Sequence, residues 1–90
     1  MTQPSLFCPT VIDAVLELLE DGKWYTLFEI HKYCIDRCHQ QIAETTASMA
    51  IRKARVIVQK KGKSLPWRYY VNTKNEITRT SEYCIKAEGR

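Results

Sequence analysis

The chain has 90 residues, of which 44% are hydrophobic, and a formal net charge of +4. This length supports one hydrophobic core, so we expect a single domain over residues 1–90, with its core at about 9–80 and a tail at 81–90. No apolar run approaches the roughly 20 residues of a membrane-spanning helix, and the start "MTQPSLFCP" lacks a secretory pattern, so we expect a cytoplasmic protein.

Charge is distributed unevenly along the chain. Residues 1–51 contain three Lys or Arg and seven Asp or Glu, whereas residues 52–90 contain eleven and three. From Ala47 to Asn75 there is no acidic side chain. Such a segregated basic half favours a polyanionic partner, although a solvated basic face without any partner has the same composition.

The first segment, "PTVIDAVLELLEDG", predicts a helix at about Pro9 to Asp21. Proline suits a first helical position, where its missing N–H is not needed. Gly22 can adopt the left-handed conformation that commonly ends a helix. Apolar residues recur on one side at helical spacing, namely Ile12, Val15, Leu16 and Leu19.

The next segment, "KWYTLFEI", combines a short extended piece with a helix start. Thr26 and Glu29 have the spacing of a capping box, in which two backbone N–H groups are satisfied reciprocally, so the second helix is expected to begin at Leu27. We expect it to fray between Ile35 and Cys38. Its inner side is predicted to contain Leu27, Ile30, His31, Cys34 and Ile35.

A third helix is predicted from the neighbourhood of Glu44–Thr46, where a threonine can cap it, to about Lys61. Gly62 is expected to end this helix and Pro66 to prevent its continuation. The segments that follow, "WRYYVN", "NTKN" and "EITRT", predict a strand, a turn and a returning strand.

The predicted hairpin covers about residues 67–72 and 76–80. Trp67 and Tyr69 share one face of its first strand and are expected to pin the hairpin onto the third helix, whereas Tyr70 is expected to be exposed. The tail "SEYCIKAEGR" is open to three interpretations: a loop, a short helix, or a strip that packs on a partner.

The third helix has two different faces on a helical wheel. The inner face contains Ala47, Ala50, Ile51, Ala54 and Val58. The adjacent arc is polar, without a carboxylate, and each member can donate hydrogen bonds: Thr45, Ser48, Arg52, Arg55 and Gln59. An ordinary solvated helix has similar residues but usually mixes charge signs. Because Arg and Gln make two-point contacts with base edges in the major groove, this arc is a candidate DNA-reading face.

Further cations follow the third helix and are candidate phosphate contacts, namely Lys61, Lys63, Arg68 and Lys74. Met49 and Val56 belong to neither face of the helix. They are left open as contacts to thymine methyl groups, as contacts to a second subunit, or as exposed residues.

The order of elements resembles a winged helix-turn-helix domain over about Pro9 to Thr80. "DGKWYTLFEI" is similar to the segment before helix two in bacterial and phage winged helices, and "TASMAIRKAR" resembles the recognition helix of small phage and prophage winged-helix proteins. The resemblance implies an α+β fold of three helices with a C-terminal β-hairpin wing. It also implies a recognition helix at about 45–61 in the major groove and a wing at about 67–80 on the DNA backbone.

We therefore expect sequence-specific binding to double-stranded DNA, in transcriptional regulation of the phage or prophage type. One such domain reads few base pairs, so a homodimer on a two-fold site is expected. Three alternatives remain. The fold can bind a host protein through Met49, Val56 and Tyr70, act as an architectural factor in excision or recombination, or bind single strands through its aromatic residues.

Other chemistry has weaker support. Enzyme activity is not expected, because neighbouring Cys38 and His39 point in different directions on a helix and no phosphate-binding loop occurs. The cysteines are expected to be reduced thiols, and no cofactor or metal is expected. Zinc is the alternative, with its ligands drawn from His31, Cys34, Cys38, His39 and either Cys8 or Cys84.

Overall fold

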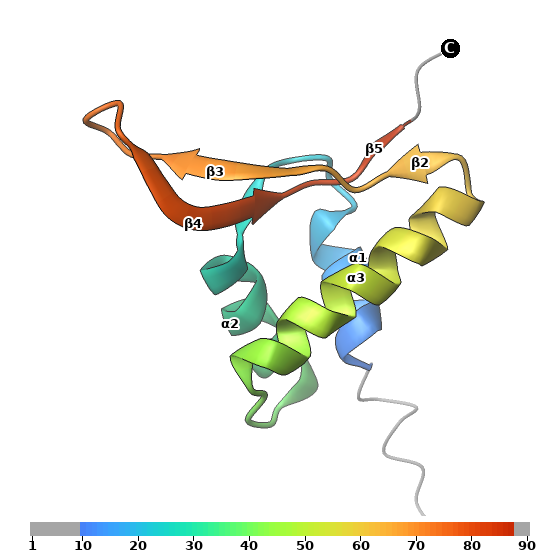
Figure 1. Cartoon of the computed structure of the whole chain (residues 1–90). Coiled ribbons are helices and arrows are strands. Elements are labelled where there is room, and N and C mark those ends of the chain that lie inside the picture. The colour runs from blue at the N-terminus through green and yellow to red at the C-terminus, as the bar shows by residue number, and fades with distance from the viewer. Residues whose placement is uncertain (1–9, 88–90) are drawn as a thin grey trace, which may run out of the picture.

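The computed structural model describes residues 10–87 and has an α+β architecture, in which three helices precede most of a small antiparallel sheet (Figure 1). This arrangement is compatible with a winged-helix layout and confirms the predicted fold class. The elements in chain order are α1 Val11–Leu19, β1 Tyr25–Thr26, α2 Leu27–Cys38, α3 Glu44–Lys60, β2 Lys63–Ser64, β3 Trp67–Val71, β4 Ile77–Tyr83 and β5 Lys86–Ala87.

Helix α1 is shorter than the sequence predicts. The Thr10 side chain caps it by accepting a hydrogen bond from the backbone N–H of Asp13 at 3.1 Å; Pro9 lies outside the described residues. Gly22 has a φ of 78° and donates its N–H to the carbonyl of Leu19, so the predicted glycine stop is confirmed. The helix buries Ala14, Val15 and Leu19.

Helix α2 begins with the predicted capping box. The Thr26 hydroxyl accepts from the N–H of Glu29, and the Glu29 carboxylate accepts from the N–H of Thr26 at 2.9 Å. The expected fraying after Ile35 is wrong, because Cys38 is buried in the core and remains helical. The helix ends at His39, which adopts a left-handed conformation with a φ of 56°.

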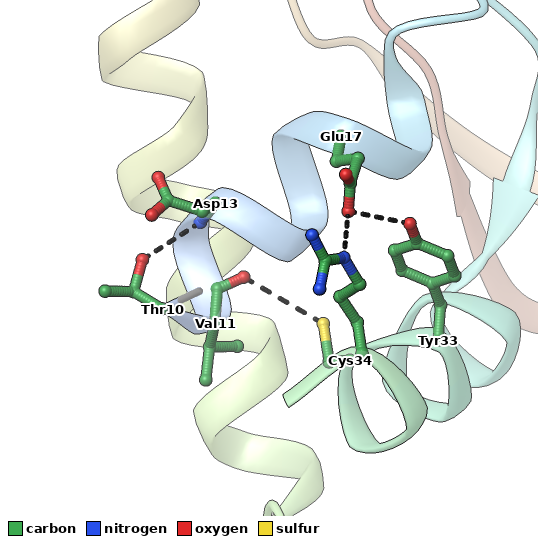
Figure 2. Close-up of polar contacts among 7 residues, drawn as sticks. Thr10, Val11, Asp13, Glu17, Tyr33 and Cys34 are labelled. Atoms are coloured by element: carbon green, nitrogen blue, oxygen red, sulfur yellow. Dashed lines mark hydrogen bonds and ion pairs between the residues drawn. The ribbon is translucent and has the colours of Figure 1, made fainter. Parts of the chain in front are cut away.

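A polar cluster on the surface connects α2 to α1. The Glu17 carboxylate accepts hydrogen bonds from the Tyr33 hydroxyl and the Arg37 Nε, each at 2.8 Å. Figure 2 shows the Tyr33 hydroxyl pointing at this carboxylate, and shows the Cys34 thiol directed at the Val11 carbonyl. The Arg37 and Tyr33 hydrogen bonds lower the pKa of Glu17. These bonds set the position of α1 across α2.

Helix α3 is the longest helix and supplies much of the core. It begins at Glu44, but the expected threonine cap is wrong: Ala43 occupies the capping position and offers no side-chain hydrogen bond. His31 Nε2 instead contacts the Ile42 carbonyl oxygen at 2.5 Å and holds the preceding turn to α2. The predicted inner face is confirmed, with burial of Ala47, Ala50, Ile51, Ala54 and Val58.

The sheet is formed by strands that lie far apart in the sequence. Strand β4 pairs antiparallel with β3 on one side and with β1 on the other, so the order is β1-β4-β3. The hairpin prediction is confirmed, but its second strand extends past residue 80 to Tyr83. In the tail, Cys84 is fully buried and β5 pairs with β2. The interpretation of the tail as a helix is therefore wrong for residues 81–87, and the loop interpretation is wrong for residues 81–83 and 86–87.

Figure 1 shows the β3–β4 hairpin running above the helices, with its turn projecting beyond them, and α3 lying in front of α1. Within residues 10–87, no helix combines the length and apolar character needed to cross a membrane.

Candidate nucleic-acid interface

The polar side of α3 is placed at the surface by burial of the opposite side. Thr45, Arg52 and Gln59 are exposed, whereas Ser48 and Arg55 are partly buried. The alanines of the inner face allow the helix to approach the core closely. The five residues predicted from the sequence as base-reading contacts therefore differ in their surroundings.

A groove of about 310 Å³ separates α3 from the sheet and brings part of this polar side together with the hairpin. Ser48, Arg52 and Arg55 line its helical wall. None of the residues that line it is acidic. The full lining consists of Ser48, Ile51, Arg52, Arg55, Trp67, Tyr69, Ser81 and Tyr83. Thr45 and Gln59 lie outside the groove, toward the two ends of α3.

Arg55 is held by the backbone that leads into the hairpin. Its Nε donates a hydrogen bond to the carbonyl of Leu65 at 3.0 Å, and Leu65 is itself buried in the core. The guanidinium keeps its charge and its other donors, but its position is fixed relative to β3. Arg55 therefore links α3 to the sheet in addition to lining the groove.

In the described part of the chain, no carboxylate forms an ion pair with Arg52 or Arg55. Within residues 10–87 the ion pairs are Arg37–Glu17 and Arg68–Glu82. Arg52 is exposed and takes part in neither of them. The helical wall of the groove thus presents positive charge and hydrogen-bond donors to whatever lies in front of it.

Arg68, a predicted phosphate contact, lies on the other face of the sheet. Residues on either side of it, Trp67 and Tyr69, line the groove, so Arg68 points away from it. Its Nε donates to the Glu82 carboxylate at 2.9 Å, and its guanidinium lies 3.9 Å from the centre of the Trp24 ring. The structure does not bring Arg68 together with the polar side of α3.

Lys61 and Lys63, also predicted as phosphate contacts, lie on the α1 side of the molecule. Both line a second groove of about 380 Å³ together with carboxylates of α1 and the residue that follows it. The acidic members of that lining are Asp13, Glu17 and Glu20. Nearby negative charge offsets the attraction that these lysines exert on a polyanion.

Lys74 lies in the turn of the hairpin, at its exposed end. The Asn72 side chain shapes this turn by accepting from the N–H groups of Lys74 and Glu76, at 2.9 and 3.0 Å. Asn75 takes the left-handed conformation, with a φ of 64°. Figure 1 shows this turn projecting beyond the helices.

The aromatic residues of β3 are more exposed than the sequence suggests. Trp67 and Tyr69 are 52% and 48% exposed, whereas Tyr70 is 36% exposed. The sequence predicts that Trp67 and Tyr69 pin the hairpin onto α3, but both residues are about half exposed and face α3 across the groove. Ser81 and Tyr83 were missed altogether, although the alternation of "EITRTSEY" continues into the tail and places them on the same face.

The histidine and cysteine residues of α2 make structural contacts in the core or beside it. Within residues 10–87, no group of three or more His, Cys, Asp and Glu side chains could hold a metal ion, and Cys8 lies outside this range. Cys34, Cys38 and Cys84 are buried. Burial raises the pKa of the Cys34 thiol to about 11, with a further contribution from Cys38, so Cys34 is an inert thiol at neutral pH.

Comparisons of this chain with protein-family models, with curated proteins and with solved structures found no match.

Proposed function

We propose that the chain binds double-stranded DNA, with α3 in the major groove and the β3–β4 hairpin along the neighbouring backbone. The observation that supports this most is the helical wall of Ser48, Arg52 and Arg55, which carries two cations and no carboxylate. A major groove is wide enough to admit an α-helix. Its phosphates supply the negative charge that the helix lacks.

In this arrangement the side chains have separate tasks. Arg52 and Gln59, both exposed on α3, reach base edges, and Ser48 and Thr45 contact the groove margin. Lys74 approaches a phosphate from the hairpin turn. Arg68 is left out of this contact set because Glu82 holds it on the other face of the sheet. A regulator of transcription in the cytoplasm, acting as a homodimer, fits this mode of binding.

A matched pair of variants on α3 tests the proposal. Arg52→Ala and Lys53→Ala remove the same charge from adjacent positions, but Arg52 lines the groove beside the sheet and Lys53 lies on the α1 side. Fluorescence anisotropy with a labelled duplex should show Arg52→Ala binding about tenfold more weakly than Lys53→Ala, since a good base contact contributes about 1–3 kcal/mol. Equal losses would mean that only net charge matters and would contradict the proposed docking.

A second candidate function is protein binding, because one groove is apolar. Thr10, Val11, Ile12 and Met49 line this groove of about 250 Å³ between α1 and α3, and Met49 is 55% exposed. Val56 and Tyr70, the other two anchors that the sequence suggests, are not part of its lining. If this function is the main one, the protein does not bind duplex DNA at low salt, and Met49→Lys alters its self-association in sedimentation velocity.

A further inference from the structure

The groove between α3 and the sheet has two chemically different walls. One wall, from α3, carries the guanidinium groups of Arg52 and Arg55 and the hydroxyl of Ser48. The facing wall, from β3 and β4, carries Trp67 and Tyr69 together with Ser81 and Tyr83. Cations that face aromatic rings across a narrow space match the two parts of a nucleotide, a phosphate and a flat base.

The two aromatic rings that β3 contributes to the groove hold each other in a defined orientation. The rings of Trp67 and Tyr69 pack edge to face, with their centroids 5.2 Å apart and an interplanar angle of 80°. This contact restricts both rings, so a ligand loses little by ordering them. About half of each side chain remains accessible to solvent. A flat partner that covers these rings removes their apolar surface from water, which is favourable.

One side chain of the cationic wall is also held in place. The hydrogen bond from Arg55 Nε to the Leu65 carbonyl fixes one guanidinium on the helical wall of the groove. Arg52 stands one helical turn before Arg55, is exposed, and remains able to move toward a ligand. Hydroxyl groups of Ser48 and Ser81 add small donors on both walls. Together these groups can donate hydrogen bonds to one phosphate, and no carboxylate among the lining residues repels it.

We propose that this groove holds one strand of the DNA and stacks an unpaired base on the Trp67 ring, which Tyr69 packs against. The inference rests on the proposed DNA binding and refines it, because it selects DNA that has an unstacked base over a continuous duplex. In a continuous duplex each base is already stacked between its neighbours, so a Trp ring can meet base edges, sugars or phosphates but not the face of a base. A bulged or flipped base offers its whole face, and aromatic stacking is tolerant of base identity.

Three labelled DNAs of the same sequence test the inference by anisotropy: a continuous duplex, the duplex with a three-nucleotide bulge, and the single strand. The expected result is that the bulged duplex binds about tenfold more tightly than the continuous duplex, as expected for one stacked base. In Trp67→Ala this ratio falls to about one, whereas Trp67→Phe, which keeps a ring, retains most of it. Tyr70→Ala removes a neighbouring aromatic residue that does not line the groove and keeps the wild-type ratio.

Fluorescence gives an independent readout, since the chain has two tryptophans. In a Trp24→Phe background the emission reports Trp67 alone, and the bulged duplex should quench it more strongly than the continuous duplex does. Thermal unfolding of each variant, followed by circular dichroism, verifies that it is folded. If Trp67→Ala does not fold, Trp67→Phe still tests the inference, because it should fold and retain most of the preference for the bulged duplex.

The outcomes separate this inference from the proposed function. One outcome would overturn the inference and leave the proposed function intact. In it, the protein binds the continuous duplex through Arg52, shows no preference for the bulged duplex, and keeps the same ratio in Trp67→Ala. Binding of the single strand alone, weakened by Trp67→Ala, would support the groove and contradict duplex binding. The absence of binding to all three DNAs at low salt would overturn both.

Discussion

Arg68 on β3 and Glu82 on β4 form an ion pair across the hairpin, with 2.9 Å between Arg68 Nε and Glu82 Oε1. Glu82 is only 8% exposed, whereas the Arg68 side chain is more than half exposed. The register of the two strands places these residues directly opposite each other. Arg68, which the sequence predicts as a phosphate contact, instead pairs with a buried carboxylate of the same sheet.

Arg68→Ala is expected to destabilise the fold more than it weakens DNA binding. Removing the guanidinium leaves the Glu82 carboxylate buried without its partner, which costs about 1–3 kcal/mol of unfolding free energy. It also removes the contact with the Trp24 ring. Urea unfolding followed by circular dichroism measures the loss, and anisotropy with a duplex measures the binding of the folded protein.

Two further variants control for this effect. Glu82→Gln in the Arg68→Ala background should recover part of the lost stability, because the unpaired charge is then removed. Arg68→Lys keeps the charge but not the planar group that stacks on Trp24, so an intermediate stability is expected. If Arg68→Ala leaves stability unchanged and reduces duplex affinity as much as Arg52→Ala does, Arg68 is a DNA contact after all.

Glu17 is expected to make stability depend on pH in the acid range. Hydrogen bonds from Arg37 and from the Tyr33 hydroxyl lower its pKa in the folded protein (Figure 2). The folded state therefore binds fewer protons than the unfolded state. The stabilisation is complete above the ordinary carboxyl pKa of about 4.3 and is lost as the pH falls through the lowered value. Thermal unfolding between about pH 6 and about pH 3 measures this dependence, which should be weaker in Glu17→Gln.

Glu20→Gln is the matched control, because Glu20 lies one turn further along the chain and its side chain has no hydrogen bond or ion pair within residues 10–87. It should keep the acid dependence of the wild-type protein. Asp21, whose pKa is lowered mainly by the Tyr25 hydroxyl, supplies the remaining dependence in Glu17→Gln. Parallel curves for Glu17→Gln and the wild-type protein would contradict the role assigned to the α1–α2 cluster.

Thr26→Ala is expected to cost about 1 kcal/mol of unfolding free energy, since it removes half of the capping box at the start of α2. Denaturant unfolding measures the change. Thr45→Ala is the control for stability: Thr45 lies in the first turn of α3, where Ala43 occupies the capping position, and its loss should change stability by less than about 0.5 kcal/mol. Equal effects at the two positions would show that the capping box contributes nothing specific.

Local features of the fold could be predicted from the sequence. The capping box at Thr26 and the inner face of α3 depend on residues within one or two turns of each other, and both were predicted correctly. The end of α2 was predicted too early, because burial of Cys38 depends on packing against the rest of the core. The pairing of β5 with β2 joins residues more than 20 positions apart, and no local pattern in the tail indicates it.

The candidate site was predictable to a similar extent. The helical wheel found Ser48, Arg52 and Arg55, because a helix face is a local property. Their separation from Arg68 depends on which face of the sheet turns toward α3, and a strand pattern alone does not give that orientation. Trp67 and Tyr69 were predicted to pin the hairpin onto the third helix, since an alternating aromatic pair has the same pattern whether its face is covered or open.

The salt dependence of duplex binding tests the central claim most directly. Two cations can contact phosphates in the proposed arrangement, namely Arg55 on α3 and Lys74 in the hairpin turn, because Arg52 is assigned to a base edge. About two phosphate contacts give a log–log slope near −1.8, so raising salt from about 50 to about 200 mM should weaken binding of a random duplex roughly 12-fold. The slope should become shallower by about one unit in Lys74→Ala. An affinity that does not change with salt, or no binding at about 50 mM, would contradict the proposal that α3 presents its carboxylate-free side to DNA.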